Sequence, residues 1–235
     1  MSTLRVELPG MLTTVQDLGR EGLGALGVSP SGAADMVALR VGNVLVGNQA
    51  GAAALEMTLT GGTFAFEGSV AVALTGSDFG ATVSGRAFEM WSTHTVNAGE
   101  RLEIAATRSG ARCYLCVSGG IDVPRVMGSA STHLLSGMGG FEGRALRKND
   151  VVQLGAGTPP ARARRVAARV VQALAPGKTL RVTRGPQADA FSSEARKTML
   201  ERVFTVSEES NRMGLRLEGP LLDPGAHGEM ISEGV

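Results

Sequence analysis

The stretch Cys113-Tyr-Leu-Cys-Val117, followed at once by Ser118-Gly119-Gly120, gives the clearest indication of how this chain of 235 residues folds. A short apolar run that ends in glycines is typical of a buried strand closed by a tight turn. Runs of the same kind recur on both sides of it, at 54–60, 63–66, 71–74, 102–106 and 151–154. Several short strands at this spacing predict a mainly β fold with a few helices, either a barrel or a sandwich.

One helix is predicted N-terminal to these strands, over about 33–46. It starts after Ser31 and ends at Gly47-Asn48, which is good chemistry for the end of a helix. The residues expected on its buried side are Val37, Val41, Val44 and Leu45. Residues 1–31 are dense in turn formers and lack strong periodicity, so we expect loops there.

The pattern divides the chain into two halves. Residues 1–155 form an N-terminal subdomain, and 156–178 are interpreted as a linker because they hold Pro159-Pro160 and a group of arginines. Residues 179–235 are a second subdomain, with strands near 180–183, 203–206 and 215–217 and a helix across about 188–202. The arginines of the linker are Arg162, Arg164, Arg165 and Arg169. A solvated linker is favoured for them over an RNA-binding patch.

Charge and hydropathy exclude several classes of protein. The formal net charge is +1, so no overall field favours nucleic acid or an anionic membrane. No window approaches the roughly 18 to 20 apolar residues of a membrane span, and the N-terminus has no signal-peptide pattern. We therefore expect a cytoplasmic protein with neither nucleic acid nor membrane as a partner.

The two cysteines, Cys113 and Cys116, form a C-x-x-C string. On a strand, residues three apart point to opposite faces, which prevents both chelation and a disulfide. With only three histidines and no second C-x-x-C, no metal site is predicted, and the cysteines are interpreted as buried structural thiols.

Three other strings resemble motifs. The string Gly22-Leu-Gly24-Ala-Leu-Gly27 spells G-x-G-x-x-G but lacks a preceding apolar strand, so a glycine-rich loop is favoured over a dinucleotide site. Gly177-Lys178-Thr179 resembles the end of a Walker A loop without its first glycine, so this chain is not expected to bind ATP by a P-loop. Ser129, Ser131 and His133 are close in sequence, but a polar turn is favoured over a catalytic triad.

Polar residues are concentrated in three glycine-rich loops. The first, residues 13–20, contains Thr14, Gln16, Asp17 and Arg20, in which Arg20 suits a carboxylate or phosphate and Asp17 an amide or ammonium. The other two are expected to expose backbone N–H groups to an oxyanion. Their candidate substrate-binding residues are Ser118, Gly119, Gly120, Ser129, Ser131 and Thr132. A structural turn would explain each loop by itself about as well as a binding site would. The presence of all three loops in one chain favours a site.

A family resemblance is carried by a longer set of residues. It begins with Pro9-Gly10, Thr13-Thr-Val-Gln-Asp-Leu-Gly-Arg20 and Asn43-Val-Leu-Val-Gly-Asn48, and continues with Arg112 to Pro124 and Gly139-Gly-Phe-Glu-Gly-Arg-Ala-Leu146. Arg212-Met-Gly-Leu-Arg-Leu-Glu-Gly-Pro220 and Ile231-Ser-Glu-Gly-Val235 complete it. Over the whole chain, the sequence resembles the KipA family, whose members are also called allophanate hydrolase subunit 2, the C subunit of 5-oxoprolinase or biotin-dependent carboxyltransferase.

The resemblance implies a cyclophilin-like β-barrel architecture in two subdomains and a KipI-type partner (allophanate hydrolase subunit 1). It implies a subunit of an ATP-dependent 5-oxoprolinase-type hydrolase of a small amide or lactam, with a lactam-utilisation-type protein as a third subunit. Two alternatives are open: a carboxyltransferase module of a biotin-dependent urea carboxylase or allophanate hydrolase, and a regulatory protein that antagonises a kinase inhibitor. The lysines lack a Met-Lys-Met context, so any biotin would come in trans from another polypeptide.

The hydrolase interpretation gives the candidate residues their roles. ATP used by the complex would phosphorylate the lactam oxygen, and Arg20 with the backbone N–H groups would hold the substrate or the intermediate. Asp17 or Asp35 would be a general base, although both also suit turn and helix-cap positions. Because members of the family continue past the position of Val235, we expect the second subdomain to be truncated.

Overall fold

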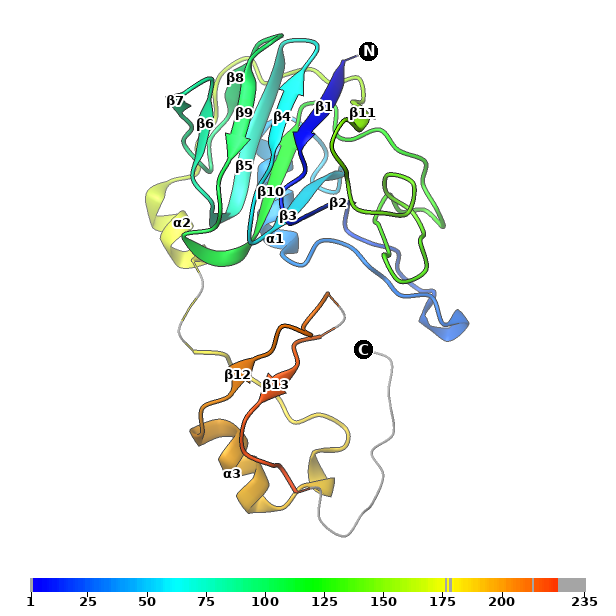
Figure 1. Cartoon of the computed structure of the whole chain (residues 1–235), viewed down its shortest axis with the longest axis vertical. Helices are drawn as coiled ribbons and strands as arrows, with labels where there is room; N and C mark the ends of the chain where they lie inside the picture. Colours follow the sequence, from blue (N-terminus) through cyan, green and yellow to red (C-terminus); the bar gives the residue numbers. More distant parts are fainter. Residues whose placement is uncertain (1, 176, 178, 213, 224–235) are drawn as a thin grey trace. The chain divides into compact units, whose positions relative to one another are not determined.

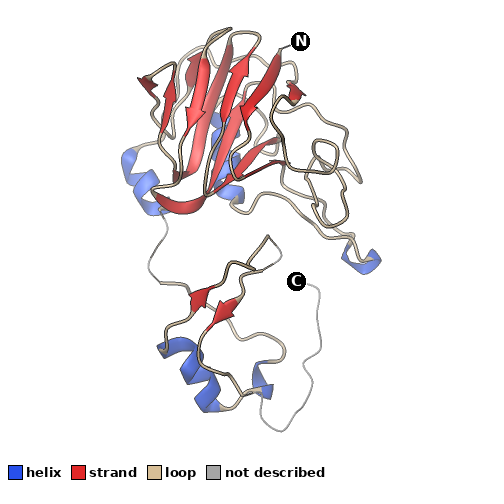
Figure 2. Cartoon of the chain, in the orientation of Figure 1, coloured by secondary structure: helices blue, strands red, loops and turns tan. Residues whose placement is uncertain are grey.

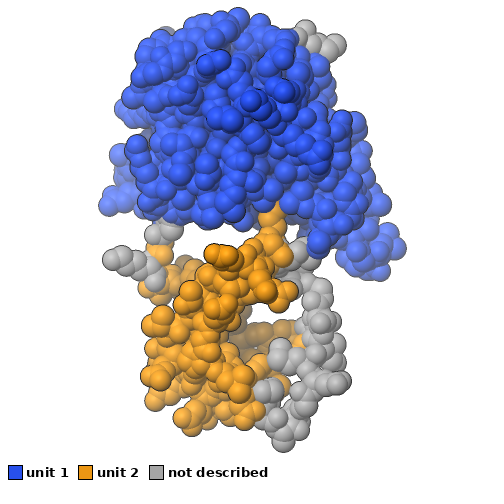
Figure 3. Space-filling model, viewed as in Figure 1, with its two compact units in different colours: residues 1–176 blue, residues 177–235 orange. Residues whose placement is uncertain are grey.

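The computed structural model describes residues 2–175, 177, 179–212 and 214–223 (Figure 1). The chain forms two compact units, residues 1–176 and 177–235, which Figure 3 colours separately. The unit boundary therefore falls near the C-terminal end of the segment 156–178. Within that segment, Arg164 and Val166 exchange backbone hydrogen bonds with Thr93 and Trp91, and helix α2 (Ala168–Leu174) follows. Most of the predicted linker is thus part of the first unit.

The first unit contains two antiparallel sheets (Figure 2). One has six strands in the order β11-β1-β4-β9-β6-β7. Their bounds are β1 (Thr3–Leu8), β4 (Thr63–Phe66), β6 (Ala81–Val83), β7 (Arg86–Ala87), β9 (Arg101–Ile104) and β11 (Val151–Gln153). The other has five strands in the order β2-β3-β10-β5-β8. Their bounds are β2 (Leu12–Gln16), β3 (Ala54–Thr58), β5 (Val70–Asp78), β8 (His94–Val96) and β10 (Ser109–Val117). The predicted mainly β fold is confirmed.

Both sheets contribute to one hydrophobic core. The six-stranded sheet contributes Phe64 of β4 and Leu102 of β9, and the five-stranded sheet contributes Leu55 of β3 and Leu115 of β10. All four side chains are fully buried in the same cluster. Because side chains alternate along a strand, the other face of each strand is left for different partners. The interior between the two sheets is therefore apolar, and polar chemistry lies on outer faces and loops.

Helix α1 (Met36–Leu45) covers the outer face of the five-stranded sheet. The predicted helix is confirmed, but its predicted buried stripe is only half right: Leu45 is buried and Val41 packs against the same cluster, whereas Val37 and Val44 are each 50% exposed. Besides Leu45, the helix buries Ala38, Leu39, Gly42 and Asn43. A Cβ atom at Gly42 would lie 2.6 Å from the Cys116 sulfur, so small residues let this side of the helix approach the sheet.

The strand prediction for Cys113 and Cys116 is confirmed. Both thiols are free and fully buried, Cys113 in the core between the sheets and Cys116 under α1, and so on opposite faces of β10. Burial raises the pKa of each thiol well above its ordinary value, since the thiolate would lose its hydration. These are inert structural cysteines.

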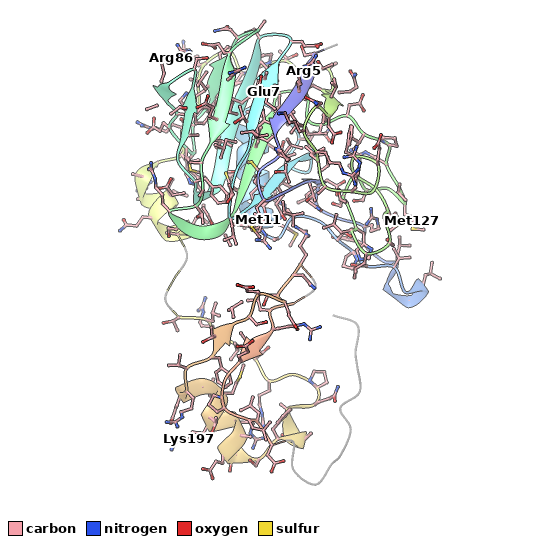
Figure 4. All side chains as sticks on the ribbon, in the orientation of Figure 1. Arg5, Glu7, Met11, Arg86, Met127 and Lys197 are labelled. Atoms are coloured by element: carbon pink, nitrogen blue, oxygen red, sulfur yellow. The ribbon has the colours of Figure 1, made fainter. Side chains whose placement is uncertain are left out.

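The first two strands were not expected. In β1, Leu4 and Val6 are fully buried, while Arg5 and Glu7 point outward and form ion pairs with Glu67 and Arg101 (Figure 4). This alternation is visible in the sequence, but it spans too few residues to stand out beside the neighbouring turns. The glycine-rich string 22–27 is a loop with a single turn of 3-10 helix, η1 (Gly24–Leu26), as predicted.

The second unit is small. It contains η2 (Ala188–Ala190), α3 (Ser193–Glu201) and a two-stranded sheet of β12 (Thr205–Val206) and β13 (Leu217–Glu218). The predicted strand at 180–183 is absent from the described residues, and Leu180 is 88% exposed, so no apolar surface holds that segment in a sheet. Among the described residues of the whole chain, no helix is long and apolar enough to span a membrane.

Candidate functional site

The sheet topology brings the predicted loops to one end of the five-stranded sheet. Strands β2 and β10 both pair antiparallel with β3, so they run in the same direction. Gln16 at the end of β2 lies opposite Ala54, and Ile121 just after β10 bonds to Ala53. The loops that follow β2 and β10 therefore start at the same edge, although about a hundred residues separate them in sequence.

Asp17 is the centre of this loop cluster and is 4% exposed. Its Oδ1 accepts hydrogen bonds from the hydroxyls of Ser129 and Ser131, both at 2.6 Å, and from Gly19 N at 2.8 Å. Its Oδ2 accepts from Ala130 N at 2.7 Å. Burial by itself raises the pKa of Asp17, but these hydrogen bonds outweigh it and the pKa lies below its ordinary value. Asp17 is thus an ionised carboxylate that joins two distant loops.

Arg20 lies in the same cluster and is 2% exposed. Its Nη2 donates to Ser131 O at 2.7 Å, its Nη1 to Ser31 Oγ at 3.0 Å and its Nε to Val126 O at 3.4 Å. The three nitrogens of the guanidinium all donate to the protein itself. Because the guanidinium is buried and three of its five N–H groups already donate to the protein, Arg20 holds loops together in this arrangement.

Thr14, Gln16 and Thr132 also meet, as expected of neighbouring site residues. Gln16 Nε2 donates to Thr14 Oγ1 at 3.0 Å and to Thr132 O at 3.2 Å. Gln16 is fully buried, and its Oε1 has no hydrogen-bond partner among the described residues. This orphaned acceptor is a polar group that a water or a ligand N–H could satisfy.

The backbone N–H groups expected to face an oxyanion bond within the protein instead. Gly119 N donates to Asn48 Oδ1 at 2.8 Å, and Ser118 N and Gly120 N donate to main-chain oxygens. In the second loop, the N–H groups of 129–132 are likewise taken, by oxygens of the same loop, of Asp17 and of Val15. With every such N–H occupied, neither loop forms a phosphate or oxyanion cradle. Lys178 of the Walker-like string lies outside the described residues.

Asp35 does not join the Asp17 cluster. It is exposed and precedes α1, where its Oδ1 accepts from Ala38 N at 2.9 Å. This is the helix-cap position that was the alternative to general-base catalysis. The serines near His133 bond to Asp17, and His133 Nδ1 lies 2.7 Å from Ser136 Oγ, which is the geometry of a polar turn.

A second polar cluster was missed by sequence reasoning. Glu56 on β3 is 1% exposed, and its Oε2 accepts from Tyr114 Oη at 2.8 Å and Ala34 N at 2.9 Å. The Tyr114 oxygen accepts in turn from Asp35 N at 2.7 Å. The available signal was a single glutamate inside the otherwise apolar run of β3. Among the described residues, no group of three His, Cys, Asp or Glu side chains is arranged to hold a metal.

The sequence and fold of this chain are similar to those of known proteins. The family model for the carboxyltransferase domain, subdomain A and B, matches residues 26–235. The chain belongs to this family. The resemblance stated from the opening loop and the later motifs is therefore confirmed.

The chain is similar both to 5-oxoprolinase subunits and to urea amidolyases. The chain is 40% identical to the C subunit of 5-oxoprolinase from Escherichia coli over 232 residues, which cover 99% of this chain and 74% of that protein. It is 35% identical to urea amidolyase of Saccharomyces cerevisiae over 93% of this chain but only 12% of that protein. The solved urea amidolyase of K. lactis matches with a TM-score of 0.82 at 33% identity, covering 93% of this chain and 14% of that one.

Proposed function

We propose that this chain is a subunit of an ATP-dependent 5-oxoprolinase-type hydrolase, active together with a KipI-type partner and a lactam-utilisation-type third subunit. The observation that carries the proposal is the 40% identity to the C subunit of 5-oxoprolinase, which spans 74% of that relative. The urea amidolyase match is lower in identity and spans a small part of a much longer chain. The substrate in this proposal is 5-oxoproline, which is opened to glutamate.

The proposal assigns ATP to the other subunits. The N–H groups of the loops at 118–120 and 129–132 are all used inside the protein, so these loops do not suit a nucleotide phosphate. What this chain contributes is the shape of the loop cluster. Asp17 and Arg20 hold the loops through buried charge-assisted hydrogen bonds, and Gln16 keeps a buried Oε1 without a hydrogen-bond partner among the described residues.

A carboxyltransferase module of a biotin-dependent urea carboxylase is the second candidate. It is favoured by the family description and by the match to the solved K. lactis urea carboxylase, with a TM-score of 0.82 at 33% identity. The three lysines of this chain have no biotinylation context, so biotin would be carried by another polypeptide.

The test is reconstitution of the chain with the products of its neighbouring genes. Under the proposal, the complex releases glutamate from 5-oxoproline with ATP and without biotin, and leaving out this chain abolishes the release. Carboxylation of urea that requires biotin, with no glutamate release, would establish the second candidate. Activity on neither substrate, together with binding to a kinase inhibitor, would place the chain in a regulatory class.

A further inference from the structure

Strand β3 carries Glu56 where an apolar residue is expected, facing Arg112 and Tyr114 of strand β10. Arg112 Nε lies 3.6 Å from Glu56 Oε1, and Tyr114 donates to the other carboxylate oxygen. Arg112 and Tyr114 are two residues apart on one strand and so share a face. A carboxylate that is only 1% exposed costs several kcal/mol unless it is paired. Glu56 therefore fixes the position of the Arg112 guanidinium.

The guanidinium of Arg112 uses little of its own hydrogen-bonding capacity inside the protein. A guanidinium has five N–H donors. Among the described residues, the one side-chain hydrogen bond of Arg112 runs from Nη1 to Ala111 O at 3.3 Å. Its Nε–H is buried without an acceptor at hydrogen-bond distance, and its side chain remains 24% exposed. Spare donors are thus held in place within reach of a solute.

Two other arginines of the first unit provide a contrast. The guanidinium of Arg20 donates from all three nitrogens to protein oxygens. Arg144 has the same exposure as Arg112, but it is bound by the carboxylates of Glu142 and Asp150 on both sides. Partial burial lowers the pKa of Arg112, because its charge has lost hydration that its protein partners do not fully replace. Arg112 is thus the least satisfied of these three cations.

We propose that Arg112 binds the carboxylate of a small ligand, with Glu56 as its positioning residue. The planar fork of an arginine matches the two oxygens of a carboxylate, and a charge-assisted pair of this kind is stronger than a neutral hydrogen bond. The carboxylate beside it is already engaged, because Glu56 accepts hydrogen bonds from Tyr114 and Ala34. The inference rests on the proposed function for the ligand's identity, since 5-oxoproline carries one carboxylate.

A simpler role for Arg112 would be to neutralise Glu56. A double-mutant comparison separates this role from ligand binding. Binding to the full-length chain is measured by calorimetry for wild type, Arg112→Gln, Glu56→Gln and the double variant. The probes are 5-oxoproline, cyclopentanecarboxylate, which lacks the lactam, and pyrrolidinone, which lacks the carboxylate. Thermal unfolding is followed for each protein. Arg108→Gln is the matched control, because Arg108 is an exposed arginine that lies 3.9 Å from Asp78.

We expect the double variant to regain the unfolding temperature that Arg112→Gln loses. Both Arg112→Gln and the double variant should bind 5-oxoproline and cyclopentanecarboxylate at least tenfold more weakly than wild type. Arg112→Lys should fall between wild type and Arg112→Gln. Wild-type affinity in the double variant would overturn the proposal, and so would a wild-type chain that binds neither carboxylate. Binding of cyclopentanecarboxylate that depends on Arg112, in a complex that does not open 5-oxoproline, would support the site and refute the proposed function.

Discussion

Replacing Asp17 by asparagine tests whether this carboxylate is the main link between the loops that follow strands β2 and β10. The side chain keeps its size but loses its charge, and one oxygen becomes an NH2 group. The Oδ2 atom that accepts from Ala130 N at 2.7 Å would then be a donor facing a donor. The three hydrogen bonds at Oδ1, from Ser129, Ser131 and Gly19, would remain but lose their ionic character.

The expected cost follows from these contacts. A buried donor left without a partner costs about 1–3 kcal/mol, and a charge-assisted hydrogen bond is roughly twice as strong as a neutral one. We therefore expect Asp17→Asn to lower the free energy of unfolding of the first unit by about 3 kcal/mol. At about 2–4 °C per kcal/mol for a unit of this size, the melting temperature falls by roughly 6–12 °C.

Urea denaturation followed by the fluorescence of Trp91, which lies in the first unit, measures this change. The matched control is Asp35→Asn, because asparagine caps a helix about as well as aspartate and Asp35 is exposed. Its effect should stay below about 0.5 kcal/mol. An Asp17→Asn variant as mild as this control would show that the carboxylate does not hold the loops.

The same carboxylate sets a dependence on pH. The pKa of Asp17 is lower in the folded protein than its ordinary value, so its contribution to stability is complete above the unfolded pKa, about 3.9. The contribution is lost as the pH falls through the lowered folded pKa. Wild type should therefore lose stability below about pH 4 more steeply than Asp17→Asn. Parallel curves for the two proteins in this range would contradict that assignment.

Three other perturbations have defined outcomes. Arg20→Ala in the reconstituted complex should reduce turnover roughly tenfold or more, equivalent to about 1.4 kcal/mol, because the loops lose three hydrogen bonds. Unchanged turnover with normal assembly would remove Arg20 from the site. Tyr114→Phe should lower the free energy of unfolding by about 2 kcal/mol, because the Tyr114 hydroxyl donates to the buried Glu56 carboxylate and accepts from Asp35 N before α1. A chemical denaturation curve like that of wild type would count against this network. The thiols of Cys113 and Cys116 should not react with a thiol reagent at pH 8 in the native protein but should react fully in urea, because burial raises their pKa; rapid native labelling would mean that the sheet opens.

Some of the fold and of the site could be predicted without a structure. Local patterns predicted β3, β4, β9 and β10, because each is a short apolar run bounded by turn residues. They did not predict β2, whose Thr14 and Gln16 are polar yet buried. A polar residue can be buried when its hydrogen-bond partners come from elsewhere in the chain, and those partners are invisible to a local pattern.

Sequence alone was enough to establish the family, the mainly β fold, the opposite orientation of Cys113 and Cys116, and the loops that hold the polar residues. How those residues are used became clear only from the tertiary contacts. Asp17 bonds to Ser131, 114 positions away, and this contact makes Asp17 a support for two loops. Glu56 and Arg112 meet only because β3 and β10 are paired in the sheet. The chemistry of a polar side chain depends on which donors and acceptors remain unsatisfied after folding, and this is set by contacts between distant parts of the chain.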